Sequence, residues 1–477
     1  MLTILGLGPG SADDLTRRAW RALETADTVF LRTREHPCVP DLPIRDFTSF
    51  DHLYESTADF PHIYASIAEQ VIAAARAGDV VYAVPGNPLV AEESVTRLIA
   101  AAKRDSVAYT MINGISFVEP ILSLLEIDAL DGLQLYDAAA IAMGHHPPIN
   151  PDYPALLAQV FSRGMASNLK LTLMNQYSDE FEVTLVHAAG TPDALVERIP
   201  LYEIDRSAHI GYLTALYVPA LGGMSSFEQF QAIIAHLRAP EGCPWDREQT
   251  HLSLRRFLLE ETYEVLEALD NEDADALAGE LGDLLLQIVL HTQIAIDDGE
   301  FHMSDVLRAI NAKMVRRHPH VFGTASVDGS EGVVANWETI KRQERAERGE
   351  TAPQSRLDGV NTALPALMRA YELQKAAAKV GFDWTDTADV IAKVREEIDE
   401  LIAAPPDEVE RELGDLLFVV VNWARHLKVE PENALRAACA KFSRRFQYIE
   451  QAAGASMEGM SLAQMDALWD EAKAKGL

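Results

Sequence analysis

An acidic pattern that occurs twice constrains the fold of this chain more than any other feature. Residues 258–294 read LLEETYEVLEALDNEDADALAGELGDLLLQIVLHTQI, and residues 394–427 read VREEIDELIAAPPDEVERELGDLLFVVVNWARHL. Each copy contains Glu-Glu-x-x-Glu, a short connection, and then Glu-Leu-Gly-Asp-Leu-Leu. The apolar residues recur at helical spacing, so each copy predicts two successive helices that carry acids.

The acids of each copy are spaced to meet. Residues three apart share a helix face, so Glu261 projects with Glu264, and Glu280 projects with Asp283. The second copy repeats this quartet at these positions: Glu397, Glu400, Glu412 and Asp415. If the two helices pack antiparallel, the four carboxylates repel one another unless a cation neutralises them. Oxygen ligands without His or Cys favour Mg²⁺, with Mn²⁺ as the alternative, and Mg²⁺ usually also binds phosphate oxygens.

A basic pair and a tryptophan follow each acidic motif in the same order. Copy one has Lys313, Arg317, Trp337 and Lys341, and copy two has Lys441, Arg445, Trp469 and Lys473. Lys and Arg are one helical turn apart, so both can face a metal-filled groove and bind a triphosphate chain. The tryptophans could stack on a base or sugar, and burial in a helix-packing core is the alternative.

The charge balance excludes some partners. The net charge is −32, from 41 basic and 73 acidic residues, whereas nucleic acid or an anionic membrane surface requires clustered Lys and Arg. No apolar run reaches the ~18 residues of a membrane span, and MLTILGLGPG lacks the basic region of a secretory signal. The three cysteines are far apart in the sequence. We therefore expect a cytoplasmic protein without disulfides or zinc.

Apolar strands followed by glycine turns organise the first 220 residues. Residues 2–8 predict a buried strand that runs into a turn at 9–11 and a helix at about 14–25. A second strand at 79–84 precedes PGNP at 85–88 and a helix through residue 100, and a third turn is NGIS at 113–116. Turns that follow parallel strands meet at one edge of a sheet, so one ligand cleft is expected there.

In this order, LGLGPG, GDVVYAVPGNP and INGIS resemble the tetrapyrrole (corrin/porphyrin) methylase family, over about residues 1–220. The resemblance implies an α/β domain that binds S-adenosylmethionine. Many family members have Gly-Asp-Pro where this chain has Gly-Asn-Pro at 86–88. The residues that the resemblance assigns to the cofactor pocket are Gly8, Pro9, Gly10, Gly86, Asn87, Gly114, Ser116 and Ala215.

The chain changes character after residues 221–226, LGGMSS, which read as a linker between domains. Strand patterns then give way to helical ones. PWDREQTH, LLEETYE, GELGDLL, RRHPHVF and VGFDW resemble the MazG nucleoside triphosphate pyrophosphohydrolase family, which implies an all-α, Mg²⁺-dependent and usually dimeric module with both acid quartets as metal ligands. The predicted fold is therefore multidomain: an α/β methylase-like domain at 1–221, then two tandem all-α MazG-like copies at 222–350 and 351–477.

Copy two matches the family's nucleotide-binding segment, Lys-Val-x-Glu-Glu, better than copy one, because it has Lys393 where copy one has Phe257. We therefore favour copy two as the catalytic copy, while copy one is either active or structural. It would convert an NTP or dNTP and water into the monophosphate and pyrophosphate. Lys393 would bind substrate, and Glu396 or Glu397 would be the base for the water. Lys441 and Arg445 would balance charge on the leaving pyrophosphate.

Two other functions remain open on the sequence. The chain could be chiefly an S-adenosylmethionine-dependent methyltransferase whose helical half is a regulatory nucleotide-binding module, or a nucleotide-sensing scaffold without turnover. A di-iron bundle is disfavoured, because neither copy has a Glu-x-x-His pair. A homodimer through the helical module is expected by packing as well as by family, because helical hairpins must bury their apolar faces.

Overall fold

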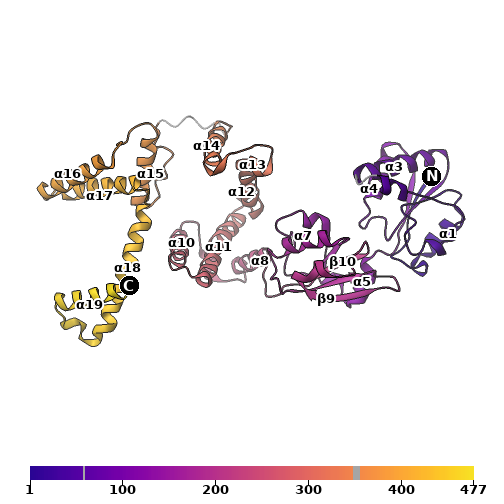
Figure 1. The fold of residues 1–477 in the computed structure, drawn as a ribbon, viewed down its shortest axis with the longest axis horizontal. Helices are drawn as coiled ribbons and strands as arrows, with labels where there is room; N and C mark the ends of the chain where they lie inside the picture. Colours follow the sequence, from indigo (N-terminus) through magenta and orange to yellow (C-terminus); the bar gives the residue numbers. More distant parts are fainter. Residues whose placement is uncertain (57–59, 348–354) are drawn as a thin grey trace. The chain divides into compact units, whose positions relative to one another are not determined.

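The computed structural model describes residues 1–56, 60–347 and 355–477 (Figure 1). Two compact units make up the chain, Met1–Arg247 and Glu248–Leu477. The predicted division into three domains is finer than this and stays a prediction. None of the helices within the described ranges combines the length and the apolar character that a membrane span requires.

A five-stranded parallel sheet opens the first unit. Its strand order is β3-β2-β4-β1-β5, with bounds β1 Leu2–Gly6, β2 Val29–Leu31, β3 Thr48–Ser49, β4 Val80–Val84 and β5 Tyr109–Ile112. Every residue of β4 is buried, as expected for a central parallel strand with both faces covered. One face packs against α3 (Phe60–Ala77) and α4 (Glu93–Arg104). The other packs against α1 (Arg17–Glu24).

A second, mixed sheet follows in the same unit, with strand order β6-β7-β10-β8-β9. The strands are β6 Gln134–Asp137, β7 Ala155–Ala158, β8 Glu182–His187, β9 Leu195–Pro200 and β10 Thr214–Val218. Its central strand β10 runs antiparallel to both β7 and β8. Helices α5 (Val118–Leu125), α6 (Ala138–Ala142) and α7 (Arg163–Leu173) accompany it. The predicted α/β class of the N-terminal half is confirmed.

The predicted linker is held by hydrogen bonds to the first unit. The Asp152 carboxylate accepts from the backbone N of Ser225 at 2.6 Å and of Ser226 at 3.1 Å, and from Ser226 Oγ at 2.5 Å. The Ser226 hydroxyl contributes most to lowering the pKa of Asp152. Ser226 also caps α8 (Phe227–Arg238), accepting from Gln229 N. The first unit therefore continues past residue 226 and includes α8.

The second unit is helical, and no strand occurs among those of its residues that the structure describes. Copy one contains α10 Arg255–Asp270, α11 Ala274–Asp297, α12 Met303–Arg317, α13 Pro319–Phe322 and α14 Gly329–Glu347. Copy two contains α15 Ala366–Ala378, α16 Thr387–Ala403, α17 Val409–His426, α18 Pro431–Ala453 and α19 Leu462–Ala474. The predicted acidic helices form two hairpins, α10–α11 and α16–α17.

Candidate metal and nucleotide site

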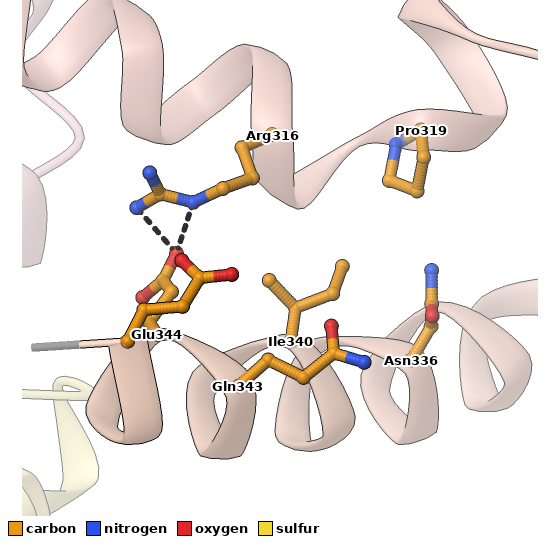
Figure 2. Close-up of a pocket in the computed structure, with 7 residues that line it drawn as sticks. Arg316, Pro319, Asn336, Ile340, Gln343 and Glu344 are labelled. Atoms are coloured by element: carbon orange, nitrogen blue, oxygen red, sulfur yellow. Dashed lines mark hydrogen bonds and ion pairs between the residues drawn. The ribbon is translucent and has the colours of Figure 1, made fainter. Parts of the chain in front are cut away.

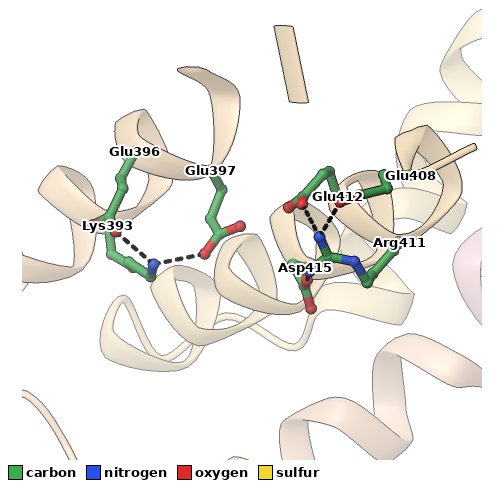
Figure 3. A network of polar contacts seen from close by, with 7 residues as sticks. All are labelled: Lys393, Glu396, Glu397, Glu408, Arg411, Glu412 and Asp415. Carbon is green, nitrogen blue, oxygen red and sulfur yellow. Dashed lines mark hydrogen bonds and ion pairs between the residues drawn. The ribbon is translucent and has the colours of Figure 1, made fainter. Parts of the chain in front are cut away.

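The α16–α17 hairpin of copy two gathers three carboxylates. One oxygen each of Glu397, Glu412 and Asp415 lies within 4.8 Å of the others (Figure 3). Glu397 is only 5% exposed and Glu412 only 7%. Three negative charges this close, two of them buried, need compensation from cations or donors.

Lys393 supplies one cation, because it lies one helical turn before the glutamates on α16. Its Nζ is 2.8 Å from Glu397 Oε1 and 2.9 Å from Glu396 Oε1. The hydrogen bonds to Glu397 and then Glu396 raise the pKa of Lys393. The second oxygen of Glu397, Oε2, is buried without a hydrogen-bond partner. A buried carboxylate oxygen without a hydrogen-bond partner costs free energy, so Glu397 Oε2 is a candidate ligand for a further cation.

Arg411 supplies a second cation from α17, and the sequence analysis missed it. Its Nη2 lies 2.5 Å from Glu412 Oε1 and 2.6 Å from Glu408 Oε2, and its Nη1 lies 3.9 Å from Asp415 Oδ2. Figure 3 shows the guanidinium between these carboxylates. Arg411 lies three residues after Glu408 and four residues before Asp415, which is the spacing of ion pairs on a helix. This spacing was the signal in the sequence that could have identified Arg411.

The α10–α11 hairpin of copy one gathers Glu261, Glu264 and Glu280, again within 4.8 Å. The pKa of Glu261 is raised most by partial loss of hydration and less by the charges of Asp283 and Glu264. Partial loss of hydration also raises the pKa of Glu280, followed by Glu264 and Asp283. The described residues of the unit include no Lys or Arg in an ion pair with these acids. Copy one therefore holds an uncompensated cluster.

Both clusters suit a hard divalent cation, since all their ligand atoms are carboxylate oxygens. In copy two the buried, unpartnered Glu397 Oε2 adds a second reason. Glu400 is not a member of the copy-two cluster, and Asp283 is not a member of the copy-one cluster. Their roles as ligands stay predictions.

The predicted copy-one arginine is held by a glutamate of α14. Arg317 Nη2 and Arg316 Nη2 each lie 2.7 Å from the Glu344 carboxylate, which is 5% exposed. Hydrogen bonds from Arg317 and then Arg316 lower the pKa of Glu344 to about 2. Figure 2 shows Arg316 and Glu344 beside a cavity of about 250 Å³ between α12 and α14. Trp337 stands edge-on to His318, with ring centroids 5.3 Å apart.

In copy two the predicted arginine and tryptophan lie together. The Arg445 guanidinium is 5.2 Å from the centroid of the Trp469 ring, and its Nε donates to the Leu477 carbonyl oxygen at 2.6 Å. Lys473 pairs with Asp470 at 3.1 Å. These contacts lie on α18 and on residues 462–477, not on the α16–α17 carboxylates.

The remaining predicted cations are Lys313 and Lys441, which are exposed, and Lys341, which is half-buried. The substrate-binding roles of the basic and tryptophan residues of both copies stay predictions.

The three glycine turns of the first unit converge, as the sequence predicted. Gly8 N donates to Gly86 O at 3.2 Å, and Gly86 N donates to Gly8 O at 2.8 Å. Asn87 Nδ2 donates to Gly114 O at 3.0 Å. A methyl group at Gly114 would overlap the Gly86 carbonyl oxygen, so only glycine allows this approach.

The other predicted cofactor residues flank the same turns. A side chain at Gly10 would collide with Thr191, and Pro9 packs against Gly190, so the first turn meets the segment after β8. Ser116 donates from both its backbone N and its Oγ to Glu119. Ala215 is buried in β10. Their roles in binding a cofactor stay predictions.

Two family models match the two halves of the chain separately, and one relative matches nearly the whole chain. The family model for Tetrapyrrole (Corrin/Porphyrin) Methylases matches residues 1–205, and that for the MazG nucleotide pyrophosphohydrolase domain matches residues 249–322 and 386–449. The uncharacterized protein YabN of Bacillus subtilis is 43% identical over 99% of this chain and 98% of its own length.

Two relatives cover the helical half. The nucleoside triphosphate pyrophosphohydrolase of Escherichia coli strain K12 is 46% identical over 52% of this chain and 98% of its own length. The nucleoside triphosphate pyrophosphohydrolase/pyrophosphatase MazG of Thermotoga maritima is 45% identical over 52% of this chain and 95% of its own. Among solved structures, uroporphyrin-III-C-methyltransferase from Thermus thermophilus covers 46% of this chain and 91% of its own, at 21% identity and a TM-score of 0.37.

Proposed function

The chain belongs to the family that joins a tetrapyrrole methylase domain to two MazG nucleotide pyrophosphohydrolase domains, and we propose that its helical unit hydrolyses nucleoside triphosphates to monophosphates and pyrophosphate. Both family resemblances expected from the sequence are confirmed. The observation that carries the proposal is the copy-two cluster, in which the buried Glu397 Oε2 lacks a partner beside Glu412 and Asp415.

Within this proposal, Glu397, Glu412 and Asp415 would hold Mg²⁺, or Mn²⁺ in its place. The bound ion would polarise the phosphates and lower the pKa of a water that attacks the α-phosphorus. Lys393 orients Glu397 and Glu396 through its two hydrogen-bonded ion pairs. Because Glu397 is a ligand, the exposed Glu396 is the better placed of the two to accept a proton from the water.

The leaving pyrophosphate needs positive charge. Lys441 and Arg445 of α18 are the proposed source, because guanidinium and ammonium groups form charge-assisted hydrogen bonds with phosphate. Trp469, which already packs against Arg445, would stack on the base or sugar.

The test is phosphorus NMR of the full chain with Mg²⁺ and a mixture of nucleoside triphosphates. We expect monophosphate and pyrophosphate from the unmodified chain and from Glu280→Ala, the matched change in copy one, and neither product from folded Glu412→Ala. Activity that survives in Glu412→Ala and disappears in Glu280→Ala would move catalysis to copy one. Nucleotide binding without products in the unmodified chain would favour the sensor function instead.

A second function, S-adenosylmethionine binding with methyl transfer in the first unit, is favoured by the convergence of the Gly8, Gly86 and Gly114 turns. Such a backbone cradle suits a ligand that approaches main-chain groups closely. Calorimetry with S-adenosylmethionine tests it: we expect binding to the unmodified chain and weaker binding to Asn87→Ala, which removes the hydrogen bond to Gly114 O. Absence of binding to the unmodified chain would contradict it.

We also propose a homodimer through the helical unit, because both acidic hairpins expose large apolar side chains. On α10–α11 these include Leu258, Leu259, Leu281, Leu285 and Ile288, and on α16–α17 they include Ile398, Ile402, Leu413, Leu417 and Phe418. Such apolar faces suit burial in an interface. Light scattering that reports a monomer would contradict this.

A cytoplasmic location agrees with three cysteines that form no disulfide.

A further inference from the structure

The two copies differ at a residue that the proposed reaction does not use. Copy two has Arg411 directly before Glu412, whereas copy one has Gly279 directly before Glu280. Resting on the function proposed above, we propose that Arg411 is a resident counter-ion that competes with the divalent cation for the copy-two carboxylates, and so makes metal binding there depend on the nucleotide.

The guanidinium already occupies two of the three clustered carboxylates. It contacts Glu412, which is 7% exposed, and approaches Asp415. A metal ion that takes the same oxygens must displace these contacts or accept a positive charge next to it. The Arg411 side chain is itself 62% exposed, so it can turn toward solvent or toward a ligand without losing a buried environment.

Charge separates the copies further. In copy two, Lys393 pairs with Glu397 and Glu396, and Arg411 pairs with Glu412 and Glu408, so two cations lie beside the clustered carboxylates. In copy one, the uncharged residues Phe257 and Gly279 stand at the corresponding positions. A bare divalent cation is therefore attracted more weakly to copy two than to copy one.

A nucleotide changes this balance. A triphosphate chain brings negative oxygens that a guanidinium binds in a bidentate manner, so Arg411 gains a new partner when it leaves Glu412. Metal and nucleotide then strengthen each other's binding by the same factor, since coupling between two ligands is reciprocal. The coupling should be larger in copy two, where the displaced cation is available, than in copy one.

The alternative is a plain surface ion pair. Exposed ion pairs of this kind contribute little to stability. If the ion pairs of Arg411 have no role beyond the surface of α17, their removal would leave the metal affinity unchanged. The two accounts therefore differ in a binding measurement that requires no turnover.

The experiment is a titration of the full chain with Mn²⁺, in which electron paramagnetic resonance measures the free ion. The titration is repeated with a triphosphate analogue that has a methylene between its α- and β-phosphorus. Copy one is silenced by Glu264→Gln and Glu280→Gln, so the signal reports copy two. In this background Arg411→Ala should tighten binding of bare Mn²⁺ by about 3- to 10-fold, as expected for removal of a partly screened cation beside the site. The same variant should reduce the gain in Mn²⁺ affinity that the analogue produces.

Two controls make the result specific. Arg369→Ala on α15 removes an equal charge at an exposed position and should leave Mn²⁺ affinity unchanged. Gly279→Arg, in a chain with copy two silenced by Glu412→Gln and Asp415→Asn, should weaken Mn²⁺ binding at copy one. The backbone position is open, because a Cβ at Gly279 meets no atom within 4 Å.

Unchanged Mn²⁺ affinity in folded Arg411→Ala, with normal binding by the silenced-copy-one parent, would overturn this inference and leave the proposed function standing. If that parent bound no Mn²⁺ even with the analogue, the proposed function itself would fail, and the inference with it. Circular dichroism of every variant separates these outcomes from misfolding.

Discussion

The two acidic hairpins, α10–α11 and α16–α17, use the same spacing of carboxylates to build clusters of different electrostatic character. In copy one, partial loss of hydration, and then the charges of neighbouring acids, raise the pKa of Glu261 and of Glu280. In copy two Lys393 and Arg411 pair with the acids instead. The acidic spacing thus determines where carboxylates meet, while the residues at positions 257 and 393, and at 279 and 411, determine how much charge the site keeps.

The largest expected difference between the copies concerns Lys393. Lys393→Ala leaves the buried Glu397 without its cation, and loss of one preorganised charged group at a reaction site costs on the order of 100-fold in rate. We expect this loss in pyrophosphate release, together with a lower midpoint of thermal unfolding. Phe257→Ala, at the matching position of copy one, should leave the rate unchanged. Equal losses in the two variants would remove the functional distinction between the copies.

A smaller difference lies at the start of the second helix of each hairpin. Asp273 caps α11 by accepting from the backbone N of Asp275 and Ala276, whereas Glu408 before α17 makes no capping bond and pairs with Arg411. Asp273→Ala should therefore lower the free energy of unfolding of the helical unit by about 1 kcal/mol. Glu408→Ala should lower it less, as measured by denaturant unfolding. The reverse order would show that capping does not distinguish the hairpins.

The smallest expected effect is a pH dependence of copy one without metal. Because the folded pKa of Glu261 and of Glu280 lies above the ordinary value of 4.5 for a glutamate, the folded unit binds protons just above pH 4.5 that the unfolded chain does not. The free energy of unfolding should therefore rise as the pH falls toward 4.5. Saturating Mg²⁺, or Phe257→Lys, should reduce this rise. A fall in stability over the same interval would contradict the raised pKa values.

The sequence predicted what depends on local pattern. Converging turns after β1, β4 and β5 followed from strands that precede glycines. Helical spacing predicted that Glu412 and Asp415 share a face of their helix, and their meeting with Glu397 depended on antiparallel packing of the two helices. The helix expected at 14–25 begins at Arg17, because residues 12–14 form a short 3-10 turn and Thr16 caps the helix through Ala19 N.

Contacts between distant residues could not be predicted in this way. The pairing of Arg317 with Glu344 joins residues 27 positions apart and depends on how α14 returns to α12. Helical spacing placed Glu400 beside Glu397, but spacing alone does not decide which of two acids faces the neighbouring helix. Arg411 was visible in the sequence, yet an acidic pattern draws attention to the acids rather than to the base between them.

The hydrogen bonds from Ser225 and Ser226 to Asp152 bear on how the gene should be divided to express its halves separately. A cut at residues 221–226 would remove from the methylase-like half the three hydrogen-bond donors to the Asp152 carboxylate. It would also leave α8 at the start of the helical half, without these contacts. A cut after residue 248, at the end of α9 (Pro244–Glu248) and beside the boundary between the two compact units in the sequence, keeps α8 with the half that anchors it. Fragments divided at the later position should therefore be more soluble than fragments divided at residues 221–226.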